Sequence, residues 1–178
     1  TLNVVASGTS TQPIEIEGYK TTPGDITEMY YTYGDGALTS GDMPLFDGFN
    51  SNADTFFDLT GASYYIIKNL QAQNFEEGLY STSSVSNVHI ERVLLTNIGD
   101  GSATYSGFGM AGVFGGSSNN WRVKESIIIN AKAEALSFFG NANLADNVKV
   151  YGDDNSETYS GTDYYHFAKG SNNIFINS

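Results

Sequence analysis

The chain has 178 residues, of which 40% are hydrophobic and 16% charged, so it can form one domain with a substantial core and is not a disordered segment. Twenty acidic residues against eight basic ones give a net charge of −12, and the resulting repulsion argues against nucleic acid and anionic membranes as partners. The absence of cysteine excludes disulfides and thiolate metal sites.

The composition also indicates a compartment. Twelve Tyr, eleven Phe and twenty Gly are typical of secreted or surface β-proteins, so we expect an extracellular or virion-surface location. No apolar run approaches the ~18 residues of a membrane span. We expect a single domain over residues 1–178 that is a segment of a longer protein.

A short alternating motif recurs along the chain. After a strand at the amino end (LNVV, 2–5), it occurs as YIIKNLQAQN (65–74), NVHIERVLLTN (87–97) and NWRVKESIIIN (120–130), then in fragments as NVKVYG (147–152) and NIFINS (173–178). Alternation of apolar and polar residues with a period of two predicts a β-strand in each copy.

Aligning the copies gives two apolar columns. The columns are Tyr65, Val88, Trp121, Val148 and Ile174, and, two positions later, Ile67, Ile90, Val123, Val150 and Ile176. Their irregular spacing favours an elongated β-solenoid, in which equivalent strands of successive coils pair in parallel at about 4.8 Å. Trp121 is accordingly predicted to be a core residue, although it could also offer a sugar-stacking surface.

Two further strands per coil are predicted. The second ends at Asn74, Asn97 or Asn130, which either pair their amides up the stack or adopt the left-handed backbone of a turn. The third occurs as TFFDL (55–59), EGLYS (77–81), AGVFG (111–115), EALSFF (134–139) and YYHFAK (164–169). The fold class is therefore all-β, with three short strands in each of about five to six coils. A helix over Ala131–Phe139 is too short to stand alone, and an antiparallel sandwich is the alternative fold.

This pattern resembles the right-handed parallel β-helix, or pectin-lyase-like, superfamily over most of the chain. The segments VVASGTSTQPIEIEGYKTTPGD (4–25), MPLFDG (43–48), TFFDLTGASYYIIKNLQAQN (55–74) and GLYS (78–81) resemble the first coils of chondroitinase B-like and alginate lyase-like enzymes, and also β-helices of viral tail proteins. The resemblance implies a protein that binds or cleaves acidic polysaccharide, or an adhesin or virion spike.

The catalytic motifs of those enzymes are missing. The only histidines are His89 and His166, neither of them in a GHG motif, and an RxPxxR element is absent because the only arginines are Arg92 and Arg122. No family catalytic residue is carried over to this chain.

Basic residues gather on the first strand of each coil. Stacking is predicted to place His89, Arg122 and Lys149 in one outward column, with Lys68, Glu91 and Lys124 beside it. Such a basic face could follow the carboxylates of an extended glycan, with Arg122 and Lys149 stabilising charge and His89 transferring a proton. The alternative interpretation is a solvated face in which Glu91 and Glu125 form ordinary ion pairs with Arg92, Arg122 and Lys124.

Three insertions, at Thr21–Asp42, Gly99–Gly112 and Gly152–Tyr165, leave the coil between its first and third strands. Their tyrosines, Tyr105, Tyr159 and Tyr164 among them, suit sugar binding or packing between subunits. Asp153, Asp154 and Glu157 are candidate ligands for Ca²⁺, although the sequence has no known calcium-loop motif, and a solvated acidic loop is the alternative interpretation. No other cofactor is expected.

The sequence thus predicts a surface or virion-appendage module, such as part of a tail fibre or spike, that is structural, binds polysaccharide, or both, without a complete active site in this segment. The alternative is a polysaccharide lyase acting on a uronate-containing glycan across the basic face. We expect a homo-oligomer such as a trimer, or flanking domains, to cap the ends of the solenoid.

Overall fold

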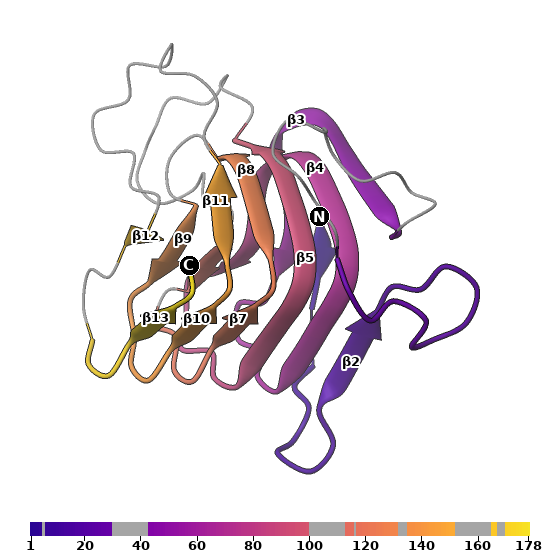
Figure 1. Cartoon of the computed structure of the whole chain (residues 1–178). Helices are drawn as coiled ribbons and strands as arrows, with labels where there is room; N and C mark the ends of the chain where they lie inside the picture. The colour runs from indigo at the N-terminus through magenta and orange to yellow at the C-terminus, as the bar shows by residue number, and fades with distance from the viewer. Residues whose placement is uncertain are drawn as a thin grey trace.

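The computed structural model describes residues 1–4, 6–29, 43–99, 113–115, 117–131, 135–151, 165–166 and 170–178 (Figure 1). Within these ranges the chain forms strands only. The strands are β1 (Leu2–Asn3), β2 (Ile14–Glu17), β3 (Leu45–Asp58), β4 (Tyr65–Ser81), β5 (Val88–Ile98), β6 (Val113–Gly115), β7 (Arg122–Lys124), β8 (Ile127–Ala131), β9 (Leu136–Phe138), β10 (Leu144–Asp146), β11 (Lys149–Tyr151), β12 (Tyr165–His166) and β13 (Ile174–Ile176). Accordingly, no helix of these ranges has the length and apolar character needed to cross a membrane.

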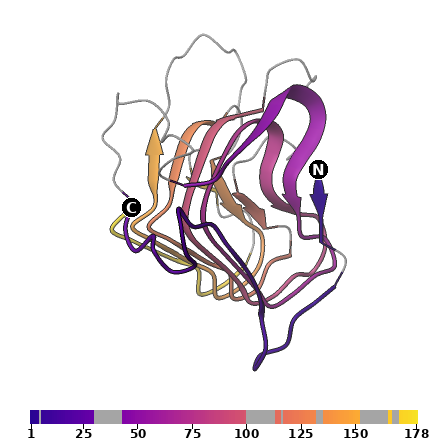
Figure 2. The ribbon, with the colours of Figure 1, turned by 90° about the vertical axis from the view of Figure 1, so that its right-hand side faces the viewer.

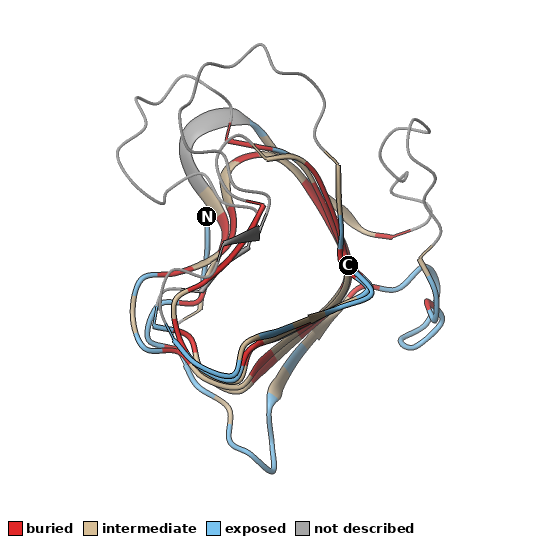
Figure 3. Cartoon of the chain, turned by 60° about the vertical axis from the view of Figure 1, so that its left-hand side comes forward, coloured by how far each residue is buried: buried red, intermediate tan, exposed pale blue. Residues whose placement is uncertain are grey.

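All strand pairs of the described residues are parallel and belong to one sheet that winds around the molecule without closing into a barrel. The first face stacks β2, the start of β4, the start of β5, β7, β10 and β13. The second face stacks the start of β3, the middle of β4 and of β5, β8 and β11. The third face stacks β1, the ends of β3 and β4, β6, β9 and β12. Successive turns of the chain superimpose around one outline (Figure 3), an arrangement compatible with a β-helix-like solenoid.

The core lies inside this outline, because alternate side chains along the strands of the first two faces point inward. On the first face the inward file is Ile16, Ile67, Ile90, Val123, Ala145 and Phe175. Trp121 is fully buried, and its indole Nε1 donates to the carbonyl of Val85 at 3.0 Å. The prediction that Trp121 is a core residue is confirmed.

Residues with positive φ mark the corners between faces. The first corner holds Tyr64, Asn87, Asn120, Ala142 and Asn172; the second holds Asn69, Arg92, Glu125, Asn147 and Asn177; the third holds Asn74, Asn97 and Asn130. Among the corners with positive φ in the described residues, consecutive corners of one coil are five residues apart, as in Asn87, Arg92 and Asn97. Asparagine tolerates this left-handed conformation better than other side chains, which explains its frequency here.

Both interpretations of the asparagines at the third corner are correct. Asn97 Nδ2 donates to Asn74 Oδ1 at 3.5 Å, and Asn130 Nδ2 donates to Asn97 Oδ1 at 3.2 Å. The same three residues have φ values of 59°, 52° and 54°. Each asparagine therefore turns the chain and bridges to the neighbouring coil.

The predicted columns are correct for the first three copies and wrong for the last two. Val150 pairs with Ile128 on the second face, and the first strand of that coil is Leu144–Asp146. In the last copy Phe175 points inward, while Ile174 and Ile176 are 52% and 45% exposed. The reason is that asparagine occupies several corners, so Asn147 at a second corner is easily mistaken for a first-corner residue such as Asn87.

The third strands follow the prediction. The structure aligns Phe57 with Leu79, Leu79 with Val113, Val113 with Leu136, and Leu136 with Tyr165. Leu136–Phe138 is strand β9, as expected from the strand interpretation of this segment.

A segment after β2, which we call the strap (residues 19–29), crosses the outer side of the second face (Figure 2). Ile26 and Met43 are buried against Leu94, Ile127 and Ile129, which point outward from the second face. The Asp25 carboxylate accepts hydrogen bonds from the backbone N–H groups of Lys20, Thr21 and Thr22 at 2.7 to 3.0 Å, and these bonds lower its pKa. The strap is thus folded by its own turn and held by apolar contacts.

Candidate functional site

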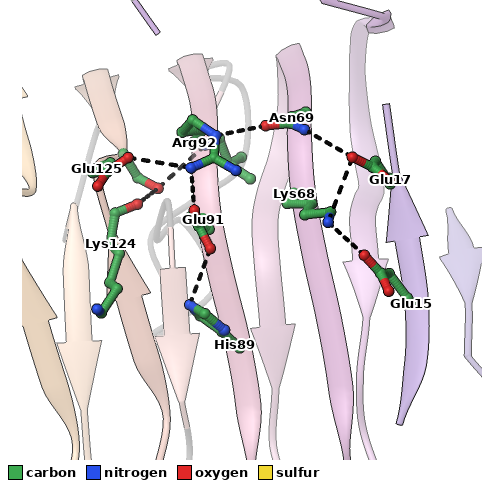
Figure 4. A network of polar contacts seen from close by, with 11 residues as sticks. Glu15, Glu17, Lys68, Asn69, His89, Glu91, Arg92, Lys124 and Glu125 are labelled. Atoms are coloured by element: carbon green, nitrogen blue, oxygen red, sulfur yellow. Dashed lines mark hydrogen bonds and ion pairs between the residues drawn. The ribbon is translucent and has the colours of Figure 1, made fainter. Parts of the chain in front are cut away.

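A polar network crosses the first face and its second corner (Figure 4). Lys68 Nζ lies 2.5 Å from Glu15 Oε1 and 3.4 Å from Glu17 Oε1. The hydrogen bond to Glu15, with the nearby carboxylate charges, raises the pKa of Lys68 despite partial burial. Lys68 is therefore neutralised by β2 and is not a free cation.

Arg92 occupies the centre of the same network. Its Nε donates to Asn69 Oδ1 at 2.8 Å, and its Nη1 contacts Glu91 and lies 3.3 Å from Glu125 Oε2. Asn69 Nδ2 in turn donates to Glu17 Oε1 at 3.3 Å. The arginine side chain is only 13% exposed, so this residue joins neighbouring coils and does not face a ligand.

The predicted basic face is not built as expected. Lys149 pairs with Ile127 on the second face, and the position next to Arg122 on the first face belongs to Leu144. The file beside it runs Glu17, Lys68, Glu91, Lys124, Asp146, so that carboxylates and ammonium groups alternate from coil to coil. The first face thus has mixed charge.

Two cations on the first face remain without a carboxylate partner among the described residues. Arg122 is exposed, and Lys124 is half-buried with its ammonium group turned away from the network in Figure 4. They lie on strand β7, two residues apart and therefore on the same outward side. These two side chains are the ones on this face that are available to an anionic ligand.

His89 lies directly beside Arg122 in the stack. Its Nε2 is 3.5 Å from Glu91 Oε2 but makes no hydrogen bond in the described part of the chain. Burial lowers the pKa of His89, with smaller opposing and supporting effects from Glu91 and from the three neighbouring cations. The imidazole is therefore neutral at pH 7, in the state that a general base requires.

A groove lies at the second corner, beside the network. It is lined by Thr27, Glu28 and Met29 of the strap, by Glu125 and Asn147 of the corner, and by Ile127 and Lys149 of the second face, with a volume of about 420 Å³. We call it the corner groove. It brings Lys149 to a site that the sequence did not predict.

The remaining predicted site residues lie outside the described part of the chain. These are Tyr105, Tyr159 and Tyr164, considered for sugar binding, and Asp153, Asp154 and Glu157, considered for calcium. The described residues contain no group of three or more acidic, histidine or cysteine side chains able to hold a metal ion. Calcium binding at Asp153, Asp154 and Glu157 therefore stays a prediction.

The alternative interpretation, in which Glu91 and Glu125 pair with basic residues of the face, is correct for Arg92 and wrong for Arg122 and Lys124. Sequence reasoning missed the link from Arg92 to Asn69 and the corner groove. A signal for the corners was present, because asparagines recur at intervals of five residues, as at Asn69 and Asn74. With that interval, Arg92, Glu125 and Asn147 could have been aligned at one corner. The strap contacts had no comparable signal.

Comparison with family models, with curated proteins and with solved structures finds no match for this chain. The resemblance to the parallel β-helix superfamily thus rests on the sequence pattern.

Proposed function

We propose that the chain is a right-handed parallel β-helix of about five to six coils, part of a surface or virion appendage, that binds an anionic polysaccharide along its first face. The observation that carries this proposal is the pair Arg122 and Lys124, which point outward from a flat parallel face and have no carboxylate partner among the described residues.

The spacing of the strands supports an extended ligand. Successive strands of the stack are about 4.8 Å apart, close to the length of one sugar unit, so consecutive units would meet equivalent positions of successive coils. A guanidinium beside an ammonium group suits carboxylate or sulfate groups on such a chain. The carboxylates on either side of this pair, together with the net negative charge of the protein, confine the attraction for an anionic polymer to this part of the face.

Binding to polygalacturonate, alginate and chondroitin sulfate tests the proposal. Arg122→Ala is expected to weaken binding by at least about tenfold, because it removes a charged hydrogen-bond donor worth about 1.5–3 kcal/mol. Lys20→Ala removes one positive charge from an exposed position of the strap, outside the first face and the corner groove, and is the matched control, which should bind these polymers as the parent does. Equal effects of the two substitutions, or no binding by the parent, would contradict the proposal.

Lyase activity is the second candidate function, favoured by the neutral His89 beside Arg122. In this reaction Arg122 would stabilise the uronate carboxylate while the His89 imidazole accepted the C5 proton. The bond between C4 and the glycosidic oxygen would break to form the 4,5-unsaturated product, and the departing oxygen would take a proton from water. Ultraviolet absorbance of that product measures the reaction. Activity in the parent that falls at least 100-fold in His89→Ala would establish it, and unchanged polymer in the parent would leave binding alone.

A further inference from the structure

The corner groove is a separate site with its own geometry. Glu125 and Asn147 occupy the second corner in successive coils, with φ values of 46° and 53°, and both residues are exposed. Ile127 and Lys149 are aligned partners on adjacent strands β8 and β11. The strap, anchored by Ile26, closes the other side with Thr27, Glu28 and Met29.

Several polar groups of the groove have no partner within the described residues. Lys149 and Glu28 are exposed and form no ion pair there, and the Asn147 side-chain amide makes no hydrogen bond. Glu125 differs, because Arg92 Nη1 lies 3.3 Å from its Oε2. The groove therefore offers an ammonium donor, an amide and two carboxylate acceptors to a ligand.

The charges exclude simple ions. A metal cation would be repelled by Lys149, and no group of three metal-binding side chains is found in the described residues. An anion would meet the carboxylates of Glu28 and Glu125. A neutral molecule with both donors and acceptors satisfies these groups without such repulsion.

The chemistry and the volume of the groove indicate the class of ligand more closely. The partly buried Met29 supplies most of the apolar surface among the polar groups, with a small exposed edge of Ile127, which is only 4% exposed. A sugar ring has an apolar C–H face and a rim of hydroxyl groups, so it matches both kinds of surface. The volume of about 420 Å³ falls within the range of about 300–1,000 Å³ found for small-molecule pockets.

We propose that the corner groove binds one neutral pyranose unit, with its hydroxyl groups on Lys149, Asn147 and Glu28 and its C–H face on Ile127 and Met29. This site is distinct from the anionic-polymer site of the first face, and neither requires the other.

Titration of the intact chain with glucose, galactose, mannose and N-acetylglucosamine, followed by amide chemical shifts, tests the site. We expect saturable shifts at Ile127, Asn147 and Lys149 with at least one of these sugars. Lys149→Met and Glu28→Gln should each weaken that binding about tenfold, whereas Glu15→Gln, which removes a carboxylate from β2 outside the groove, should leave it unchanged.

The outcomes separate the two sites. No saturable shifts with any of the four sugars, or tighter binding of glucuronate than of glucose, would overturn the groove proposal while leaving polymer binding untouched. Lys124→Met is a second test variant, because it should weaken only the binding of the anionic polymers. A loss of pyranose binding in Lys124→Met equal to that in Lys149→Met would also overturn the assignment.

Discussion

The left-handed backbone at the coil corners costs an ordinary side chain about 1–2 kcal/mol for each residue. Asparagine reduces that cost, and at the third corner its amide also joins one coil to the next. Asn97 is central in this ladder, since it donates to Asn74 and accepts from Asn130. The turn and the bridge are therefore separable by substitution.

Asn97→Ala should lower the free energy of unfolding by about 2 kcal/mol, because it loses both the favourable backbone and the amide bridges. Asn97→Gly keeps the backbone freedom and loses only the bridges, so it should cost about 1 kcal/mol. Urea denaturation measures both. Equal losses in the two variants would show that the backbone contribution is negligible.

Glu77 gives the folded chain a specific pH dependence. Burial raises its pKa to about 6 from the ordinary 4.5, although Thr55 Oγ1 donates to its Oε2 at 2.6 Å. The folded state thus holds this proton more tightly than the unfolded state, so stability is highest below pH 4.5 for this group and falls as the pH rises to 6.

The expected loss is about 1 kcal/mol after allowance for partial exposure to solvent. Glu77→Gln should remove this fall and stabilise the chain at pH 7, as measured by thermal unfolding between pH 4 and about 7. Glu28→Gln, at an exposed position, serves as the control and should keep the slope.

At the scale of elements, the strap converts an outward apolar stripe into a second small core. Ile26 is 6% exposed and packs on Leu94, Ile127 and Ile129. Because these contacts are separate from the main core, the strap should open without unfolding of the coils.

Ile26→Ala should therefore reduce the local opening free energy of the strap by about 2 kcal/mol, the lower end of the cost of truncating a buried isoleucine. Faster proteolysis within residues 19–29 and faster amide exchange in β8 would report it. Thr27→Ala, at an exposed neighbour, should change neither, and a global loss of stability would contradict the separate-core interpretation.

Much of the element order could be predicted from the sequence. Copies at Tyr65, Val88 and Trp121 carry a full alternation followed by asparagine, and their register is correct. The copy with Leu144–Asp146 has alanine at its inward position, so its apolar signal is weak, and the stronger alternation of Val148 and Val150 hides it. Alternation alone cannot tell one face of a coil from the next.

The predicted site failed for a related reason. A shift of five residues moves Lys149 to another face, and the ion pairs of Lys68 with Glu15 and Glu17 depend on the register between β2 and β4, which only the structure provides. Arg122 and Lys124, by contrast, belong to a copy with the correct register and keep their predicted outward place.

At the scale of the whole molecule, each coil contacts mainly its two neighbours, so stability should be lowest at the ends of the stack. The end strand β13 already exposes Ile174 and Ile176, whereas β5 is paired on both sides. Amide exchange should therefore be slowest in β4 and β5 and fastest in β1 and β13. Uniform protection from β1 to β13 would indicate a single cooperative unit instead.

The invariant interval between corners also bears on how such a chain can evolve. In the three turns that begin at Tyr64, Asn87 and Asn120, two sides have the same length, and the difference between the 23 residues from Tyr64 to Asn87 and the 33 from Asn87 to Asn120 falls in the remainder. A duplication or deletion that begins and ends at equivalent asparagines would leave the flanking layers with compatible partners. Gene segments encoding whole layers could thus be gained or lost, altering the reach of the molecule while leaving its cross-section unchanged.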